Sequence, residues 1–264
     1  MARRRPSQFE ELAISYDALN DHKDYRAEAR LLEGIARRFG PEGRTRWLDV
    51  GCATGRHLAN LRARHPVVGV DVSEAMLRIA RARLPGIRLV HADMRSFRLR
   101  SRFEVATCVY GPIGHLRTRA DVAATFRTLA QHLAPGGVAI VEPWIHPAAF
   151  RPGALYLRTH EDASGTVVRL AFSARRGDRS ILRYHFLVGR PRRGVEYHEV
   201  EDVGLLLSRQ ELLGWMRNAG LHARWIARGL TPGRGLLVGT KVEGIPSRRP
   251  AAPVPRARSG PGPR

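Results

Sequence analysis

Short apolar segments alternate with amphipathic segments through the first half of the chain. The apolar segments are predicted strands at 46–50, 67–71, 87–90, 104–110 and 137–142. Hydrophobic residues recur with the helical period between them, at 57–64, 73–83 and 119–133, and also earlier, over 25–39. Since strands that alternate with helices form βαβ units, this pattern predicts a parallel sheet covered by helices.

The pattern changes after Trp144. Four β segments are predicted to follow one another without helices, at 155–159, 166–174, 181–189 and 195–207. A helix over 208–219 and two strands at 224–228 and 236–238 complete the predicted elements. The expected fold class is therefore α/β: a Rossmann-like, doubly wound, mostly parallel seven-stranded sheet with an antiparallel β insertion (about 150–207) after strand 5.

Composition sets the limits of this domain. The 264 residues are 43% hydrophobic and 26% charged, which is ordinary for a globular protein. We expect one domain over residues 1–243 and a disordered tail over 244–264, where Pro and Arg are frequent and no apolar period is visible. No apolar run is long enough to span a membrane, and the N-terminus lacks the apolar core of a secretory signal, so a cytoplasmic protein is expected.

The net charge of +21 comes almost entirely from arginine, since Lys23 and Lys241 are the only lysines. Arginine recognises phosphate well, so a phosphorylated small molecule or a nucleic acid would suit this charge. The arginines are scattered rather than gathered into one stripe with aromatic residues, which favours compositional bias and makes nucleic acid an unlikely partner. With only two cysteines, Cys52 and Cys108, neither a disulfide scaffold nor a metal site is expected.

A glycine turn follows the first predicted strand, in the sequence Leu48-Asp49-Val50-Gly51-Cys52-Ala53-Thr54-Gly55. In a doubly wound sheet this turn lies at the carboxyl edge, where a ligand meets the N-terminus of a helix. A dinucleotide fingerprint would require glycine where Ala53 and Arg56 stand. Because Asp49 would repel a pyrophosphate, the turn favours a neutral or cationic nucleoside.

Two more acids end the second and third strands. Asp71 lies 20 residues after Gly51, where an acid can accept hydrogen bonds from ribose hydroxyls. Asp93 can accept from an adenine amino group, with Met94 against the ring. Each acid alone could be a polar strand end, but three at successive strand ends predict a cationic nucleoside site.

These residues resemble the S-adenosylmethionine site of class I methyltransferases, and Leu133-Ala134-Pro135-Gly136-Gly137 is a further mark of that superfamily. A closer resemblance, over most of residues 8–240, is to the nucleotide-sugar N,N-dimethyltransferases, which complete the dimethylamino sugars of macrolide antibiotics. It is carried by the strings Lys23-Asp24-Tyr25, Asp93-Met94-Arg95, Ile113-Gly114-His115-Leu116, Val141-Glu142-Pro143-Trp144, Arg183-x-His185-Phe186 and Gly233-Arg234-Gly235-Leu236. The chain departs from the family pattern at Ala53, at Gly111-Pro112 and at Asp202, where a histidine is expected.

The resemblance implies a set of site residues. S-adenosylmethionine would be bound by Tyr16, Tyr25, Asp49, Gly51, Ala53, Gly55, Asp71, Val72, Met76, Asp93 and Met94. Catalysis would involve His115 and Tyr110, and the acceptor, a small molecule and in particular a nucleotide-linked amino sugar, would contact Trp144, Ser173, Arg175 and Arg234. No metal is expected, no membrane partner is expected, and a homodimer is left open.

Each of these roles has a simpler alternative. His115 would act as a base for the amine or orient it, or it is a loop histidine bonded to backbone; Tyr110 and Trp144 would line the acceptor site or only pack. The tyrosines are equally compatible with core positions. Two rival functions also remain: a methyltransferase acting on RNA or another natural product, and a non-catalytic protein that keeps the methyltransferase fold.

Overall fold

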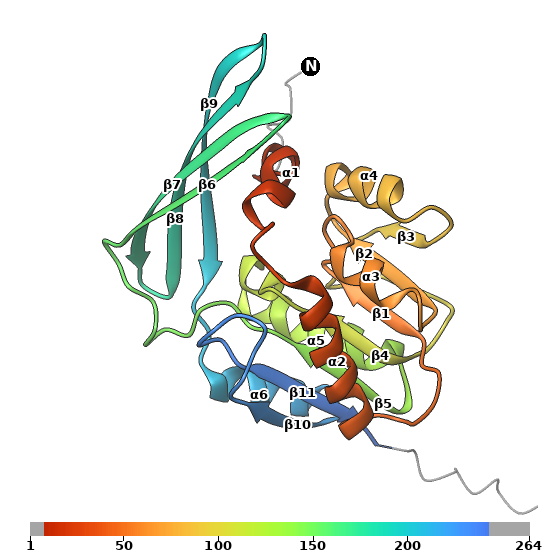
Figure 1. The fold of residues 1–264 in the computed structure, drawn as a ribbon. Coiled ribbons are helices and arrows are strands. Elements are labelled where there is room, and N and C mark those ends of the chain that lie inside the picture. The colour runs from red at the N-terminus through yellow and green to blue at the C-terminus, as the bar shows by residue number, and fades with distance from the viewer. Residues whose placement is uncertain (1–7, 243–264) are drawn as a thin grey trace, which may run out of the picture.

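A seven-stranded sheet covered by helices forms the larger part of the molecule, and a second sheet lies to one side of it (Figure 1). The computed structural model describes residues 8–242. The first half of the described chain contains, in order, α1 (Gln8–Leu19), α2 (Tyr25–Phe39), β1 (Trp47–Val50), α3 (Arg56–Leu61), β2 (Val67–Asp71), α4 (Glu74–Arg83), β3 (Arg88–His91), β4 (Phe103–Cys108), the 3-10 helix η1 (Pro112–His115), α5 (Arg119–His132) and β5 (Leu133–Val141). The second half contains β6 (Leu155–Asp162), β7 (Gly165–Arg176), β8 (Arg179–Arg190), β9 (Gly194–Leu205), α6 (Arg209–Asn218), β10 (Leu221–Ile226) and β11 (Leu236–Lys241).

The strand order of the large sheet is β10-β11-β5-β4-β1-β2-β3. Five strands are parallel, while β11 runs antiparallel to both β5 and β10. The order reverses beside β1, so the carboxyl ends of β1 and β4 flank the switch point where doubly wound folds bind ligands. The expected mostly parallel seven-stranded sheet is confirmed.

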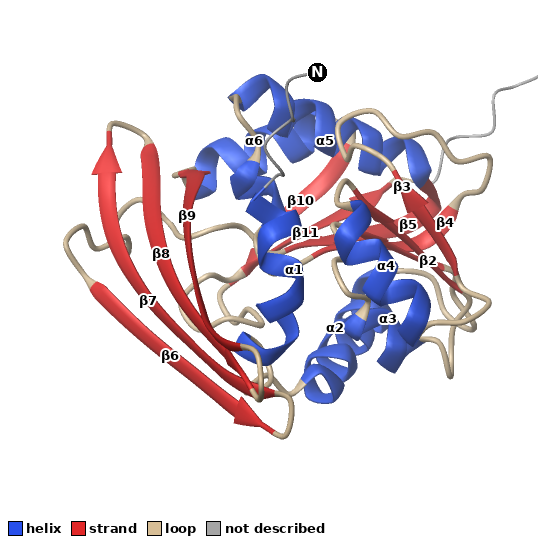
Figure 2. Ribbon diagram, turned by 90° about the horizontal axis from the view of Figure 1, so that it is seen from above, coloured by secondary structure: helices blue, strands red, loops and turns tan. Residues whose placement is uncertain are grey.

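Helices cover both faces of this sheet (Figure 2). On one face α5 and α6 pack on the strands through buried residues that include Phe126, Leu129 and Met216. On the other face α2, α3 and α4 contribute Leu32, Leu58 and Leu77. Since both faces are apolar and covered, the strands are held rigidly and the loops at their carboxyl ends are free to carry chemistry.

A second, antiparallel sheet of order β6-β7-β8-β9 is the expected insertion. Residues paired directly across antiparallel strands share a face. One face, the inner face, carries Arg169, Tyr184, Phe186 and Asp202 and packs against the C-terminal end of α1 at Leu19. The other face, the outer face, is directed away from α1. The insertion therefore brings its inner face toward the carboxyl edge of the large sheet.

Several element boundaries differ from the sequence prediction. Helix α1 and the 3-10 helix η1 were not predicted as separate elements. Strand β5 begins at Leu133, directly after α5 and four residues earlier than predicted. Gly136 within it has a φ of +72°, and the register with β4 shifts between Leu133 and Val138. The predicted tail, residues 244–264, lies outside the described residues. Among the helices of the described range, none has the length and apolar character needed to cross a membrane.

A buried histidine makes the fold sensitive to acid. Both ring nitrogens of His132 are used: Nδ1 lies 2.7 Å from the Thr128 carbonyl oxygen, and Nε2 lies 3.0 Å from the Leu99 backbone nitrogen, whose N–H it accepts. Protonation of the ring would add a hydrogen to Nε2, and this N–H would then face the Leu99 N–H, which is also a donor. Burial, opposed in part by the bond to Thr128, lowers the pKa of His132 from its usual 6.5. The folded protein therefore holds this ring neutral.

We expect the unfolding free energy to fall as the pH drops below about 6.5, because the unfolded chain then binds the His132 proton before the folded chain does. The slope from this residue cannot exceed about 1.4 kcal/mol per pH unit. His132→Phe should be less stable at pH 7.5 but have a flatter pH profile between pH 6.5 and 5. Denaturant unfolding at several pH values measures this, with the exposed His222→Gln as control. Parallel profiles for wild type and His132→Phe would contradict the prediction.

Candidate active site

The turn between β1 and α3 is shaped by glycine at two positions. Gly51 has a φ of +74°, and a Cβ there would lie 2.9 Å from the Pro112 side chain. Gly55 has a φ of +75°, caps α3, and a Cβ there would lie 2.6 Å from Leu84 Cδ1. Since both positions combine a left-handed backbone with a close neighbour, only glycine fits them. The two glycines thus allow Pro112 and Leu84 to pack closely against the turn at the switch point.

Asp71, at the end of β2, holds this turn in place. Its Oδ2 accepts from the Ala53 backbone N–H at 2.8 Å, and its Oδ1 accepts from the Ser73 backbone N–H at 2.8 Å. Burial raises the pKa of Asp71, although these backbone hydrogen bonds oppose the shift. The carboxylate therefore joins the glycine turn to the N-terminus of α4, which Ser73 caps.

Ala53 is in the left-handed region, with a φ of +46°. Alanine pays a steric cost there that glycine avoids, so Ala53→Gly is expected to raise the unfolding free energy by about 0.5–1 kcal/mol. Thermal or denaturant unfolding measures this. Ala219→Gly is the matched control, because Ala219 has an ordinary φ of −79° and gains nothing from glycine. A destabilised Ala53→Gly protein would contradict the prediction.

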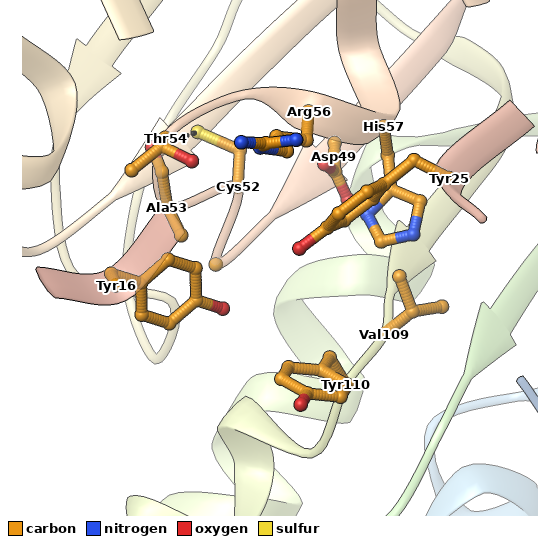
Figure 3. A pocket seen from close by; sticks show the side chains of 11 residues that line it. Tyr16, Tyr25, Asp49, Cys52, Ala53, Thr54, Arg56, His57, Val109 and Tyr110 are labelled. Atoms are coloured by element: carbon orange, nitrogen blue, oxygen red, sulfur yellow. Dashed lines mark hydrogen bonds between the residues drawn. The ribbon is translucent and has the colours of Figure 1, made fainter. Parts of the chain in front are cut away.

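A pocket lies over the glycine turn. It is lined by residues 51–54, 56 and 57 of the turn and the start of α3, and by Tyr16, Tyr25, Tyr110, Asp49 and Val109. Figure 3 shows the three tyrosines pointing into one space, with Tyr16 and Tyr25 on the side of the turn and Tyr110 across from them. Five of the predicted cofactor residues, together with Tyr110, are therefore brought together: Tyr16, Tyr25, Asp49, Gly51 and Ala53.

The electrostatics of this pocket favour a cation. Asp49 is 3% exposed, and burial raises its pKa, opposed by His57 and by a 2.8 Å hydrogen bond from the Thr107 hydroxyl. Among the described residues no ion pair is formed with this carboxylate. A positively charged sulfur or ammonium group would stabilise it. Aromatic walls, a close backbone and a buried acid together fit S-adenosylmethionine.

Helix α1 is fastened over the turn by Asp17. Its Oδ1 accepts from the Thr54 hydroxyl at 2.7 Å and from Arg56 Nε at 3.1 Å, while its Oδ2 pairs with Arg83. Burial alone would raise the pKa of Asp17, but these partners hold it below its usual value. Three elements, α1, the turn and α4, meet at this one carboxylate, so Tyr16 is held above the pocket.

The other predicted cofactor residues do not line the pocket. Gly55 is the N-cap of α3, Met76 is buried in α4, and Val72 is exposed. Asp93 accepts from the guanidinium and the backbone N–H of Arg95, and Arg95 Nη1 also bonds Asp121 at 2.9 Å. These bonds occupy both oxygens of Asp93, so a contact between Asp93 and adenine stays a prediction. Met94 lies close to the glycine turn: a Cβ atom added to Gly51 would be 3.8 Å from Met94 Cε.

Tyr110 separates the pocket from a group of buried cations. Its backbone is in the left-handed region (φ +70°), fixed by a bond from its N–H to Glu142 Oε2 at 2.8 Å, and its hydroxyl donates to Asn20 Oδ1 at 2.7 Å. Lys23 Nζ lies 3.4 Å from the centre of its ring, and Arg234 Cζ lies 5.6 Å away. Such strain in a bulky residue is typical of functional sites.

Three cationic side chains around Tyr110 have a buried nitrogen without a hydrogen-bond partner among the described residues: Lys23 Nζ, Arg169 Nε and Arg234 Nη1. Lys23 Nζ is 3.2 Å from Glu28 Oε1, close enough for an ion pair but outside hydrogen-bond geometry. Burial lowers the pKa of both Lys23 and Arg169. We call these three side chains the cation cluster. A buried cationic nitrogen without a hydrogen-bond partner is costly, so these three groups fit an anionic ligand.

Trp144 and His115 lie beside the cation cluster. Trp144 Nε1 donates to the Ser180 hydroxyl at 3.0 Å, and Arg234 stacks 4.6 Å over its ring. The ring centres of His115 and Trp144 are 5.3 Å apart. The structure therefore brings together His115, Tyr110, Trp144 and Arg234, all predicted for the acceptor side.

Two predicted substrate residues are not brought to this place. Ser173 is fully buried, and its hydroxyl donates to the Arg151 carbonyl and accepts from the Ala154 N–H, so it secures the loop before β6. Arg175 is exposed and bonds the carbonyl of Gly177 at 2.9 Å in the β7–β8 turn. A direct contact of either residue with the substrate stays a prediction.

Sequence reasoning missed several residues of the site. Lys23 and Glu142 lie inside strings quoted for the family resemblance, and that was their only signal. No signal in the sequence marked Asp17, since its role depends on a contact with Arg83 of α4. Arg169 is one arginine among many, and only the pairing of β7 with β8 places it on the inner face.

Comparisons with known proteins agree with this geometry. A family model described as "Methyltransferase domain" matches residues 48–137. The chain is 38% identical over 232 residues to the dTDP-3-amino-3,6-dideoxy-alpha-D-glucopyranose N,N-dimethyltransferase of Streptomyces fradiae, covering 87% of this chain and 90% of that protein.

Solved structures give the same result. The crystal structure of DesVI from Streptomyces venezuelae superposes with a TM-score of 0.82 at 34% identity, covering 87% of this chain and 97% of that chain. CalS10, an amino pentose methyltransferase from Micromonospora echinaspora solved with S-adenosylmethionine bound, gives a TM-score of 0.77 at 33% identity, covering 87% and 95%. The likeness spans both sheets, since it covers most of the described residues.

Proposed function

The chain belongs to the family of S-adenosylmethionine-dependent dTDP-amino-sugar N,N-dimethyltransferases, and from this premise we propose that it methylates the amino group of a sugar linked to a nucleoside diphosphate. The Streptomyces fradiae relative is named as an N,N-dimethyltransferase of a dTDP-linked amino sugar, and CalS10 is named as an amino pentose methyltransferase. We treat residues 1–243 as one catalytic domain that includes the β6–β9 insertion, and 244–264 as a tail outside the reaction.

The single observation that carries the nucleotide link is the cation cluster. Lys23, Arg169 and Arg234 each hold a buried nitrogen without a hydrogen-bond partner in the described part of the chain. A diphosphate supplies anionic oxygens for such groups, and arginine binds phosphate through two parallel hydrogen bonds. A free amino sugar, neutral or cationic, would leave this cluster unsatisfied. The cluster therefore supports a nucleotide-linked acceptor.

When bound, S-adenosylmethionine supplies an activated methyl group on a positively charged sulfur. The chain's residues provide alignment and exclude water. Tyr16 and Tyr25 enclose one side of the pocket, Asp49 offers its carboxylate to the cation, and Tyr110 is the wall shared with the cation cluster. An acceptor held by Arg234 would thus lie beside Tyr110 with its amine directed past the ring into the cofactor pocket, because the amine nitrogen must face the methyl group directly.

The amine must reach this point without its extra proton, because an ammonium nitrogen has no lone pair. His115 is the base that we propose, since it lies beside Trp144 at the edge of the cation cluster. A positioned base accelerates such a step by about 10²–10⁴-fold at most, and a sugar amine that is partly neutral needs less. His115 therefore assists the reaction rather than making it possible.

The test is an incubation of the protein with S-adenosylmethionine labelled in its methyl group and three acceptor sets: thymidine-diphosphate amino sugars, the same sugars without the nucleotide, and RNA. We expect label in the nucleotide-linked sugars, with mono- and dimethylated products separated by mass. Equal labelling of the free sugars would contradict the nucleotide link. Label in RNA alone would overturn the proposed acceptor.

We further propose a homodimer through the outer face of the second sheet. This face exposes large apolar residues on all four strands: Leu155, Leu157, Leu170, Phe172, Leu187, Val195 and Tyr197. Arg183 and Glu201 lie on the same face in neighbouring strands, so two copies related by a two-fold axis can pair opposite charges. An exposed apolar patch of this kind marks an interface.

Analytical ultracentrifugation should show a dimer for the wild type and a monomer for the Leu170→Glu/Phe172→Glu double variant, because the two carboxylates would be buried without partners. Arg217→Glu, on the exposed side of α6, is the control and should remain dimeric. A monomeric wild type at every concentration tested would contradict the proposal.

A further inference from the structure

A histidine and an aspartate from distant parts of the chain form a close pair between the two sheets. His115 ends η1, which follows β4 by a short loop, and Asp202 lies on β9 of the insertion. His115 Nδ1 and Asp202 Oδ1 are 2.9 Å apart. The insertion thus delivers a carboxylate to the loop that also carries Tyr110.

The pair is shielded from solvent. The Asp202 side chain is 7% exposed and the His115 side chain 17%. Asp202 stands opposite Leu182 in the β8–β9 ladder, which places it on the inner face with Tyr184 and Arg169. A hydrogen bond to a carboxylate is stronger in such surroundings than in water.

The chemistry of the pair fixes the histidine tautomer. An ionised carboxylate only accepts hydrogen bonds, so the neutral imidazole bonded to Asp202 carries its hydrogen on Nδ1. The lone pair is then on Nε2, the nitrogen on the other side of the ring. The ring itself lies next to Trp144, over which Arg234 stacks.

We propose that Asp202 is a positioning residue for His115: it orients the ring, selects the tautomer with the basic Nε2, and stabilises the ring when that nitrogen takes the acceptor's proton. This inference rests on the proposed function, because it assumes an amine that loses a proton at this place. In the step, the protonated amine of the acceptor (an ammonium) gives its proton to Nε2, the N–H electron pair stays on nitrogen as the lone pair of the neutral amine, and the neutral imidazole ring becomes an imidazolium. Nδ1–H stays bonded to Asp202, and the proton on Nε2 later passes to water.

The competing role for Asp202 is structural, since the same bond also joins β9 to η1. The two roles predict different results in a double-mutant cycle. If Asp202 acts through His115, its replacement has no further effect on kcat once His115 is gone. If it only joins the two sheets, Asp202→Asn instead lowers the unfolding free energy and weakens the binding of S-adenosylmethionine and of the acceptor, because β9 is no longer held against η1.

The cycle compares wild type, Asp202→Asn, His115→Gln and the double variant, with the acceptor that the labelling experiment identifies. We expect Asp202→Asn to lower kcat at least tenfold, to leave the Kd for S-adenosylmethionine within twofold, and to change the acceptor KM little. The double variant should match His115→Gln. Glu196→Gln is the matched control, because Glu196 is also an acid on β9 but is exposed and paired with Arg190 at the surface.

A second measurement reads the tautomer directly. Nitrogen-15 NMR of histidine-labelled protein, assigned with His115→Gln, should show His115 protonated on Nδ1. The opposite tautomer, an unchanged kcat in Asp202→Asn, or full additivity in the double variant would each overturn the proposal. Failure of the proposed function is distinguishable, since it would appear as absence of label in every nucleotide-linked sugar with the wild type.

Discussion

Replacing Arg169 and Arg234 together by alanine is expected to raise KM for the nucleotide-linked amino sugar at least about 100-fold. The reason is that each side chain holds a buried nitrogen without a partner in the described structure, placed beside Tyr110 where the diphosphate is proposed to bind. A hydrogen bond between a charged donor and phosphate contributes about 1.5–3 kcal/mol, so the loss of two gives a factor of this size. Steady-state kinetics with varied acceptor measures it.

The same double variant should bind S-adenosylmethionine normally and keep its stability. Buried cations without hydrogen bonds cost free energy in the unliganded protein, so their removal is not expected to lower the melting temperature. Arg217→Ala, exposed on α6, controls for the loss of positive charge in general. Arginine-to-lysine variants at the same two positions should recover part of the affinity, because charge returns without the planar pair of donors. An unchanged KM in the double variant would place the diphosphate elsewhere.

The architecture could be predicted from the sequence because its signals are local. Apolar segments such as 67–71 and amphipathic segments such as 25–39 carry their own period, and both elements are observed at those bounds. The insertion was predicted from four successive β segments without helices, and the four-stranded sheet confirms it. The start of β10 was placed three residues late, because Leu221 directly follows the turn at Gly220 that ends α6.

The site was predicted less completely, since it depends on contacts between distant segments. The glycine turn could be predicted from the local sequence, because Gly51 and Gly55 mark backbone conformations that only glycine adopts easily. Nothing local shows that Asp17 on α1 reaches Arg83, 66 residues away, or that Asp202 meets His115. Such pairs are fixed by how α1 and the second sheet pack, which no period in the sequence encodes.

The three acids at successive strand ends illustrate the same limit. All three lie at the carboxyl ends of parallel strands, with Asp49 inside β1, Asp71 as the last residue of β2 and Asp93 two residues after β3, but only Asp49 lines the pocket. The Asp71 carboxylate is bound to two backbone amides, and Asp93 is bound to Arg95. Spacing along the chain placed each acid at the correct edge, and the hydrogen bonds each one makes distinguish their roles.

Asp71→Ala is therefore expected to weaken S-adenosylmethionine binding through the shape of the turn as well as through lost ribose contacts. Without the carboxylate, the N–H groups of Ala53 and Ser73 lose their acceptor, and the turn is no longer joined to α4. We expect Kd to rise at least tenfold, about 1.4 kcal/mol, and the unfolding free energy to fall by about 1–3 kcal/mol. Calorimetric titration at a temperature where both proteins are folded measures the affinity.

Two comparisons separate the contributions. Glu74→Gln, an exposed acid at the start of α4, should leave both quantities unchanged, because Glu74 pairs only with surface groups. A 2′,3′-dideoxy analogue of S-adenosylmethionine should bind wild type more weakly than the natural compound does. If Asp71 also accepts hydrogen bonds from the ribose hydroxyls, Asp71→Ala will bind both compounds with the same reduced affinity, since the residue that distinguishes them is gone. If Asp71→Ala still binds S-adenosylmethionine more tightly than the dideoxy analogue by the same ratio of Kd values as the wild type, Asp71 acts on the turn alone. If Asp71→Ala binds S-adenosylmethionine with wild-type affinity, both roles are contradicted.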